Sequence, residues 1–214
     1  MRITVFGATG GTGQHLVNQA LEAGHHITAV VRNPARLQQA DHPRLEVVKA
    51  VVKADLQHLE AITEAVKGQD AVVSALGPRG KDDITVCSDG ARAIITAMRA
   101  TDSRRLIVVT ASGHIVDEGD GPFTRSMIKP MLRRFLRDGF ADFARTDQAV
   151  KASGLDWTIM RPPRLTDGRR RAYRTATDRN VRGGITIARA DLADAILTAA
   201  ADPATAGHTI ALGY

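Results

Sequence analysis

Three glycines at three-residue spacing, in Gly7-Ala8-Thr9-Gly10-Gly11-Thr12-Gly13, directly follow the short apolar run Ile3-Thr4-Val5-Phe6. The spacing predicts a strand, a tight turn and a helix that together bind a dinucleotide. Gly7 permits a sharp turn, Gly10 lets backbone approach a pyrophosphate, and Gly13 lets the helix pack closely against the strand. Free N–H groups at the start of the helix would hold the phosphates. A glycine-rich turn can also simply connect two elements, but this context favours the binding site.

The end of the second predicted strand carries arginines where an NAD site would carry an acid. The chain reads Val30-Val31-Arg32-Asn33-Pro34-Ala35-Arg36 at this point. An acidic side chain would accept hydrogen bonds from the ribose hydroxyls of NAD, whereas a guanidinium presents forked donors to a 2′-phosphate. Arg32 and Arg36 therefore favour NADP(H) as the cofactor. The alternative is that both are solvated residues before a short helix.

Ordinary short-chain dehydrogenases use a Tyr-x-x-x-Lys pair to give a proton to the forming alkoxide. The chain has two tyrosines, Tyr173 and Tyr214, and Tyr173 is followed four residues later by Thr177. Alcohol–ketone interconversion by this pair is therefore not expected, although hydride transfer belongs to the cofactor and mainly needs orientation. An acceptor that can take its proton from water, such as a flavin, a quinone or a linear tetrapyrrole, fits better.

Strand patterns alternate with helical patterns, which is typical of a parallel sheet covered on both faces. We predict strands at residues 2–6, 26–31, 45–52, 70–75, 104–110, 156–160, 184–188 and 207–212. Helical spacing predicts helices at 13–23, 56–67, 85–100, 140–153 and 190–201. Right-handed crossovers then give an α/β fold of Rossmann type in one domain over 1–214, with a doubly wound, mostly parallel sheet and helices on both faces.

Val47-Val48-Lys49-Ala50 is followed at once by Val51-Val52-Lys53-Ala54. The repeat is four residues long, and because this number is even, the side chains after it point to the same faces of the sheet as before. It predicts a lengthened third strand, or a bulge before it, with Asp55 still at the carboxyl edge of the sheet.

Two stretches without a regular pattern follow strands, at residues 111–124 and 161–183. Ligands in open α/β sheets bind at the carboxyl edge, and long loops in compact domains are usually functional. We therefore expect the substrate site between them. The second stretch carries eight arginines and two aspartates from Arg161 to Arg182, which equals the whole net charge of +6. Together with Lys129, Arg133 and Arg134, these cations predict an anionic, planar acceptor, with a basic solvated loop as the alternative.

Composition excludes several other classes. The single cysteine, Cys87, excludes an internal disulfide, and no Cys/His cluster has the spacing of a zinc site, so no metal is expected. No apolar run approaches the ~20 residues that span a bilayer and no leader pattern precedes the first strand, which predicts a soluble, cytoplasmic protein without a membrane partner. The basic charge is confined to one segment without a recognition motif, so nucleic acid is not expected. A monomer or weak homodimer is the expected assembly.

Several motifs together resemble the atypical short-chain dehydrogenase/reductases. Within them the chain is similar to the NAD(P)H-binding group that includes flavin reductase/biliverdin-IXβ reductase and the nitrogen-metabolite-regulator-like proteins. The resemblance spans nearly the whole chain and rests on Gly7 to Gly13, Val31-Arg32-Asn33, Ala54-Asp55-Leu56, Ala75-Leu76-Gly77, Val109-Thr110-Ala111-Ser112, Ser153-Gly154-Leu155-Asp156-Trp157-Thr158, Arg161-Pro162 and Ala188-Arg189-Ala190-Asp191-Leu192-Ala193.

The resemblance implies a set of cofactor contacts along the carboxyl edge. The pyrophosphate would be held by the glycine turn, at Gly7, Thr9, Gly10, Gly11, Thr12 and Gly13. Arg32 and Arg36 would hold the 2′-phosphate, and Asp55 and Leu56 would flank adenine. Leu76, Gly77 and Arg79 would line the ribose side. Thr110, Ala111 and Ser112 would frame the nicotinamide with Pro162 and Pro163.

The resemblance also points to groups that would act on the acceptor. Ser112 matches the serine beside the nicotinamide, and its hydroxyl would orient the substrate or donate a hydrogen bond. His114, two residues on, is a candidate proton source near neutral pH. Arg161 and Arg164 are candidate substrate-binding residues, and Arg164 stands where the flavin-reductase pattern has a histidine.

These observations lead to one expectation and two alternatives. The expectation is an NADPH-dependent reductase that transfers hydride to a conjugated small-molecule acceptor. The first alternative is a non-catalytic redox sensor that binds NADP(H), changes loop order and contacts another protein. The second is a biosynthetic tailoring enzyme that uses the same hydride on a polyketide-like ring.

Overall fold

The central feature of the computed structural model is an eight-stranded sheet in the order β3-β2-β1-β4-β5-β6-β10-β8. The structure describes residues 1–50, 59–78, 80, 84–121, 124–129, 131 and 136–214. Its strands are β1 (Arg2–Phe6), β2 (His26–Val31), β3 (Leu45–Lys49), β4 (Ala71–Ser74), β5 (Arg105–Val109), β6 (Asp156–Arg161), β10 (His208–Gly213) and β8 (Arg174–Thr177). All neighbours pair in parallel except β8, which runs antiparallel to β10.

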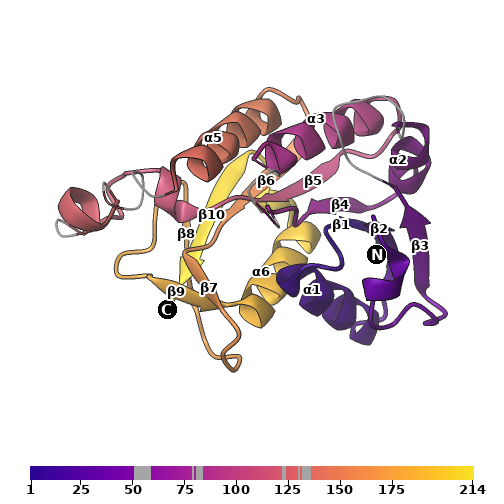
Figure 1. Cartoon of the computed structure of the whole chain (residues 1–214), viewed down its shortest axis with the longest axis horizontal. Helices are drawn as coiled ribbons and strands as arrows, with labels where there is room; N and C mark the ends of the chain where they lie inside the picture. Colours follow the sequence, from indigo (N-terminus) through magenta and orange to yellow (C-terminus); the bar gives the residue numbers. More distant parts are fainter. Residues whose placement is uncertain (51–58, 79, 81–83, 122–123, 130, 132–135) are drawn as a thin grey trace.

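Helices cover both faces of this sheet (Figure 1). One face carries α1 (Gly11–Glu22) and α6 (Arg189–Ala201), and the other carries α2 (Leu59–Val66), α3 (Val86–Arg99) and α5 (Arg137–Lys151). Each helix turns one apolar stripe inward because residues three or four apart share a face.

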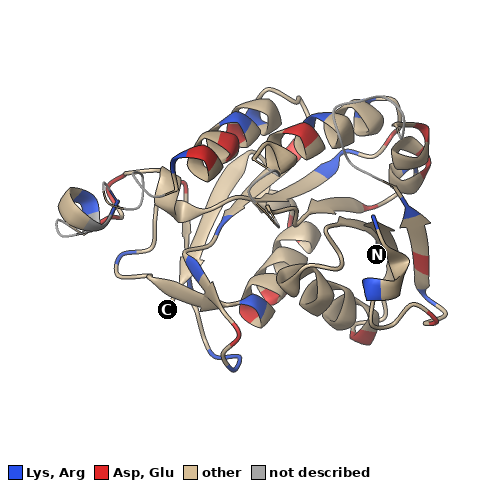
Figure 2. Ribbon diagram, in the orientation of Figure 1, with Lys and Arg blue, Asp and Glu red and all other residues tan. Residues whose placement is uncertain are grey.

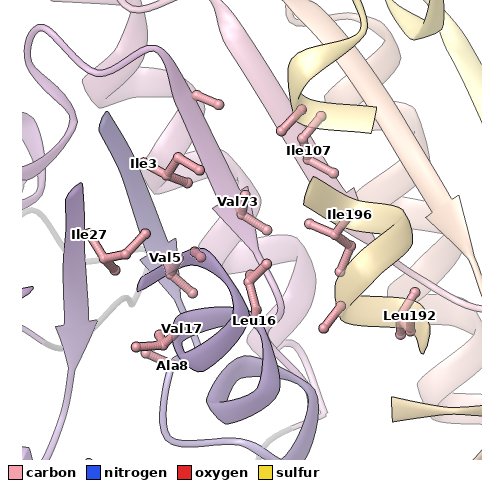
Figure 3. Packing of buried hydrophobic residues seen from close by; sticks show 14 of the residues in the cluster. Ile3, Val5, Ala8, Leu16, Val17, Ile27, Val73, Ile107, Leu192 and Ile196 are labelled. Carbon is pink, nitrogen blue, oxygen red and sulfur yellow. The ribbon is translucent and has the colours of Figure 1, made fainter. Parts of the chain in front are cut away.

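Two buried clusters result, one under each layer of helices. The first joins β1 and β2 to α1 and α6, and Figure 3 shows Leu16 and Val17 of α1 near Val5, with Leu192 and Ile196 of α6 nearby. The second lies beneath α2, α3 and α5 and includes Phe6, Ile94 and Met98. The strands are apolar on both faces, as expected of a parallel sheet buried on both sides.

The parallel strands bring the turns that follow them to one edge. Gly7 follows β1, Arg32 follows β2, Ala75 follows β4, Thr110 follows β5 and Pro162 follows β6. Strand order reverses between β1 and β4, which is the point where ligands of open α/β sheets bind. The fold therefore collects most of the sequence-predicted site residues at one edge.

The start of α3 is held by a side chain from α5. The carboxylate of Asp142 accepts hydrogen bonds from the backbone N–H groups of Cys87, at 2.9 Å, and Ser88, at 3.3 Å. It thus caps two N–H donors that have no partner within the helix. Burial and the nearby Asp142 carboxylate raise the pKa of the Cys87 thiol to about 12.

The predicted fold class is confirmed, and most predicted strands agree within a residue. Two predictions were wrong in part. The strand expected at 184–188 is β9 (Thr186–Ala188), which leaves the main sheet and pairs in parallel with β7 (Arg164–Thr166). The stretch 161–183, expected to be irregular, contains β7 and β8, whose short, arginine-flanked sequences are stabilised by pairing with distant strands.

Some predictions fall outside the described ranges. β3 ends at Lys49, with Ala50 the last described residue before the gap, so the second half of the Val47–Ala54 repeat lies outside them. Asp55, Leu56 and Arg79 also lie outside the described residues, as do Arg133 and Arg134. Within the part of the chain that the structure describes, no helix is both long enough and apolar enough to cross a bilayer.

Candidate functional site

The glycine turn after β1 closes so tightly that side chains are excluded from it. Gly7 has a φ of +81°, and a Cβ there would lie 2.5 Å from the carbonyl oxygen of Ala75. A Cβ on Gly13 would lie 2.2 Å from the carbonyl oxygen of Gly7. The turn is closed by a hydrogen bond from the Gly10 N–H to the Gly7 carbonyl, at 2.9 Å. The glycines therefore let β1, the turn and α1 approach the end of β4.

The first turn of α1 presents backbone donors with little competition from the protein. Gly10 precedes the helix in extended conformation, and no side chain among the described residues caps this end. The first turn also lacks an acidic residue. A helix N-terminus carries partial positive charge, so this end is suited to a phosphate.

The turn after β2 brings Arg32 and Arg36 to the same edge. Asn33 accepts a hydrogen bond from the Ala35 N–H at 3.1 Å, which starts the 3₁₀ turn Pro34–Arg36. Both arginines are exposed. Guanidinium groups at this edge are forked donors of the kind that bind phosphates.

The turns after β5 and β6 are joined to each other. The Thr110 N–H donates to the Met160 carbonyl at 2.9 Å, and the Ser112 N–H donates to the Pro162 carbonyl at 2.9 Å. Thr110 is buried, and its hydroxyl has no hydrogen-bond partner among the described residues. A buried polar atom without a partner is costly, which makes this hydroxyl a candidate ligand contact.

Behind this turn lies a buried ionic network of His114, Asp147 and Arg161. The Ala111 carbonyl accepts a hydrogen bond from His114 Nδ1 at 2.6 Å, and Asp147 Oδ2 accepts one from Nε2 at 3.0 Å. Arg161 donates to the same carboxylate oxygen at 2.7 Å. The side chains are 3, 9 and 8% exposed, so the network is screened little by water.

The network favours a charged Asp147. Burial works against that charge, but the His114 hydrogen bond and the Arg161 guanidinium outweigh it and hold the pKa of the Asp147 carboxyl below its usual range. The His114 ring and the Arg161 guanidinium both contact the same oxygen of the Asp147 carboxylate. Phe140 and Phe143 of α5 pack near the ring, at 6.4 and 6.0 Å between centroids. The network thus fixes the Ala111 carbonyl against α5.

The two stretches predicted to enclose the substrate are connected by a second polar cluster. The carboxylate of Asp117 accepts the Asn180 N–H at 3.0 and 3.1 Å and the Gly119 N–H at 2.8 Å. The Asn180 side chain donates to the Ile115 carbonyl at 3.3 Å. Lys129 pairs with Asp120 beside it, at 2.5 Å and about 5% exposure on both side chains. We call Asp117, Asp120, Lys129 and Asn180 the loop latch.

Part of the arginine-rich segment is neutralised by α6. Arg170 pairs with Asp194 at 2.5 Å and with Asp191 at 3.5 Å, and Tyr173 donates a hydrogen bond to Asp194 at 2.9 Å. Arg171 lies over the ring of Tyr214, 3.6 Å from its centroid. Figure 2 shows basic and acidic positions together where the segment between β7 and β8 approaches the start of α6. Arg164, Arg169, Arg179 and Arg182 remain exposed.

A model of a protein family described as NAD(P)H-binding matches residues 7–203, from the glycine turn to two residues beyond α6. The chain belongs to this NAD(P)H-binding family. The uncharacterized protein YwnB of Bacillus subtilis is 30% identical over 206 residues, which cover 92% of the chain and 91% of that protein. The reductase pytE of Aspergillus terreus is 28% identical over 236 residues, which cover 89% and 88%.

Solved structures show the same fold. A short-chain dehydrogenase/reductase from Veillonella parvula in complex with NADP superposes with a TM-score of 0.82 at 21% identity, over 100% of this chain and 94% of that one. A proposed NADH-flavin reductase from Streptococcus pneumoniae gives 0.80 at 22% identity, over 100% and 99%. Family and relatives together support an NAD(P)H-dependent oxidoreductase.

The residues of the site fit the dinucleotide of the NAD(P)H-binding family. The close approaches at Gly7 and Gly13, the uncapped start of α1 and the orphaned Thr110 hydroxyl all lie along the edge where the sequence predicts it. Leu76 and Gly77 follow β4 at that edge, and Thr9 and Thr12 lie in the glycine turn. Pro162 is buried and Pro163 half-buried beside the Ser112 turn. Their individual contacts with the cofactor stay predictions.

The structure places the predicted catalytic and substrate residues in two different settings. Ser112 is half-buried and Arg164 exposed, so both remain accessible. His114 and Arg161 are instead buried in the ionic network with Asp147. Sequence reasoning missed Asp147, although its position three residues before the buried Val150 places it on the inward stripe of α5. An acid on such a stripe signals a buried partner.

Proposed function

We propose that the chain is an NADPH-dependent reductase that transfers hydride to a conjugated, anionic small-molecule acceptor. The observation that carries the proposal is the glycine turn, which closes onto Ala75 at the switch point between β1 and β4 and leaves the start of α1 without a side-chain cap. This arrangement supplies backbone donors to a pyrophosphate where the nicotinamide can reach the turns after β5 and β6.

The preference for NADPH rests on the turn after β2. Arg32 precedes the short 3₁₀ turn and Arg36 is its last residue, and both are exposed. The position directly after β2 is thus an arginine rather than an acid that would repel a 2′-phosphate. Replacing Arg32 with Ala should weaken NADPH binding by about 1.5–3 kcal/mol, the range for a hydrogen bond to a charged group, and leave NADH binding unchanged. An equal loss for both nucleotides would contradict this assignment.

The cofactor would supply the hydride, and the residues of the chain would orient the acceptor. Ser112 lies three residues after the end of β5, and its N–H donates a hydrogen bond to the Pro162 carbonyl. This contact supports a position of Ser112 on the predicted nicotinamide side. His114 is hydrogen bonded at both nitrogens, which supports a role in positioning the Ala111 carbonyl rather than in direct proton transfer. The acceptor would then take its proton from water, as flavins, quinones and tetrapyrroles can.

Tyr173 offers no replacement for the missing tyrosine–lysine pair. Burial and the hydrogen bond to Asp194 raise the pKa of its phenol above the usual value. A catalytic tyrosine needs the opposite shift, toward neutral pH. This supports a mechanism that depends on orientation.

The anionic character of the acceptor rests on the arginines that α6 does not neutralise. Arg164 is exposed directly after the Pro162-Pro163 turn, and Arg179 and Arg182 flank the loop latch. These guanidinium groups would attract carboxylates or phosphates.

The proposal is tested by steady-state turnover of NADPH with flavin mononucleotide, neutral riboflavin and simple quinones at rising salt. We expect flavin mononucleotide to be preferred at low salt and the preference to shrink as salt screens the arginines. Equal turnover at every salt concentration would contradict the anionic acceptor.

The same assay separates the alternatives. A protein that binds NADPH and oxidises none across flavins, quinones and biliverdin is a sensor of the cofactor. Turnover restricted to polyketide-like ketones would identify a biosynthetic tailoring enzyme.

A further inference from the structure

The small sheet of β7 and β9 brings together two residues that are 22 positions apart. Its parallel register pairs Thr166 with Ala188, so the next residues, Asp167 and Arg189, leave the two strands side by side. The Arg189 guanidinium donates to the Asp167 carboxylate at 2.6 Å. Asp167 is 82% exposed and Arg189 is 28% exposed, so solvent weakens this pair and an incoming anion can compete with it.

The side chain of Arg189 crosses the first residue of α1. A Cβ built on Gly11 would lie 2.7 Å from Cδ and 2.9 Å from Nε of Arg189. The missing side chain of Gly11 thus makes space for the Arg189 side chain, whereas the missing side chains of Gly7 and Gly13 make space for neighbouring backbone atoms. The neighbouring contact from Gln19 Nε2 to the Ala190 carbonyl, at 2.9 Å, holds the start of α6 against α1.

The position of this cation is electrostatically unfavourable without an anion. Helix N-termini favour negative charge, yet the start of α1 has no acid in its first turn and no side-chain cap, and an arginine lies across it. Asp167, which faces solvent, is the counter-charge that the structure places on Arg189. A pyrophosphate at the glycine turn would lie between the helix N–H groups and the guanidinium.

We propose that Arg189 is a pyrophosphate-binding residue, which closes the glycine turn from the α6 side and exchanges Asp167 for the dinucleotide. The proposal rests on the proposed cofactor site and adds to it a contact from outside the first βαβ unit. Because the pyrophosphate is common to NADP⁺ and NAD⁺, Arg189 contributes affinity for both and selects neither. Arg32 and Arg36 would select between them.

The test is calorimetric titration of NADP⁺ and of NAD⁺ into the unaltered protein and into Arg189→Ala, Arg189→Lys and Asp167→Asn. We expect Arg189→Ala to weaken both nucleotides by the same factor, about tenfold or more. Arg189→Lys should recover part of the loss because it keeps the charge. Asp167→Asn should bind both nucleotides at least as tightly as the unaltered protein, because it removes a competing carboxylate.

Arg92→Ala is the matched control, because Arg92 also pairs with an aspartate, Asp89, at 3.1 Å, but lies on α3. It should bind both nucleotides as the unaltered protein does. A thermal unfolding transition, measured for each variant, would show that every variant is folded at the temperature of the titration.

Three results would overturn the proposal. They are unchanged affinity in Arg189→Ala, a loss confined to NADP⁺, and an equal loss in Asp167→Asn, which would make the ion pair a structural tie. An unaltered protein that binds neither nucleotide would overturn the proposed function as well, so the two failures are distinguishable.

Discussion

The two halves of the carboxyl edge are built in opposite ways. Around β1 and β2 the edge is made of glycine backbone, an uncapped helix start and exposed arginines. Around β5 and β6 it is held by side chains, with the network of His114, Asp147 and Arg161 behind the Ser112 turn and the loop latch beyond it. The first half exposes cationic side chains and backbone donors to solvent, whereas the second buries its charged side chains against one another.

This difference suggests a division of labour, in which the first half binds the cofactor and the second half positions the loops around the acceptor. Backbone donors and exposed cations are suited to the phosphates of a dinucleotide, which are the same in every reaction cycle. Binding them requires close approach of the backbone and little side-chain specificity. Buried ion pairs fix the conformation of a loop, because each unpaired group would be costly in a dry environment. Substitutions in the first half should therefore act on cofactor affinity and those in the second on stability and acceptor turnover.

The largest effect should come from Gly13→Ala in the backbone half. The new Cβ would lie 2.2 Å from the Gly7 carbonyl oxygen, a contact that no side-chain movement can relieve. We expect a loss of more than about 3 kcal/mol in the free energy of unfolding and loss of NADPH binding, measured by urea denaturation and titration.

Gly139→Ala is its matched control, since Gly139 is likewise the third residue of its helix, with nothing within 4 Å of its Cβ position. This change should be neutral or should stabilise the protein by up to about 1 kcal/mol. Equal effects of the two substitutions would contradict the difference between the helix starts.

The next effect should come from Asp147→Asn in the ionic half. Removing this charge leaves His114 and Arg161 buried beside a neutral amide, and breaking such a network costs about 3–5 kcal/mol. Urea denaturation measures the loss, and NADPH affinity of the folded fraction should change much less. The control is Asp156→Asn, whose exposed pair with Arg104, at 4.0 Å, should contribute less than about 1 kcal/mol. A large loss of NADPH affinity in Asp147→Asn would show that this half of the edge also contributes to cofactor binding.

A smaller effect should follow from opening the loop latch with Asp117→Ala. The N–H groups of Gly119 and Asn180 would lose their acceptor, which costs about 1–3 kcal/mol. We expect a higher KM for the acceptor and an unchanged affinity for NADPH, in steady-state kinetics and titration. Glu118→Ala, at the exposed neighbouring position, should behave as the unaltered protein. An altered affinity for NADPH would make the latch part of the cofactor site.

The smallest effect should be a pH dependence of the free energy of unfolding, which we expect from the half of the edge that contains Asp147. The pKa of Asp147 is lower in the folded protein than the unfolded value of about 3.9. Its stabilisation is therefore fully present above the unfolded pKa and is lost as the pH falls through the folded pKa. The stability difference between the unaltered protein and Asp147→Asn should therefore shrink as the pH falls below about 4. A constant difference down to pH 3 would contradict the charged state of Asp147.

The elements of the fold with strong local patterns could be predicted from the sequence. The strand and glycine turn of residues 2–13 and the helices on either side of β5 carry their own periodicity, and all were found within a few residues. β7 and β9 were not recognised as a pair because each is three residues long and depends on its partner rather than on its own sequence.

The candidate site was predictable only where backbone chemistry defines it. The spacing of Gly7, Gly10 and Gly13 is enough to predict their role. The roles of Asp147 and Arg189 depend on tertiary contacts. Asp147 lies 33 residues from His114, and Arg189 lies 178 residues from Gly11. No local pattern links such pairs.

The cap that Asp142 places on α3 has a consequence for chemical durability. Thiolates, not thiols, add to quinones and react with peroxide, and at a pKa of about 12 the Cys87 thiol is almost wholly protonated at neutral pH. Cys87 is also the one cysteine of the chain, and it is buried. The proposed reduction of quinones or flavins would take place among electrophiles and oxidants, and burial keeps the single thiol of the chain unreactive toward them.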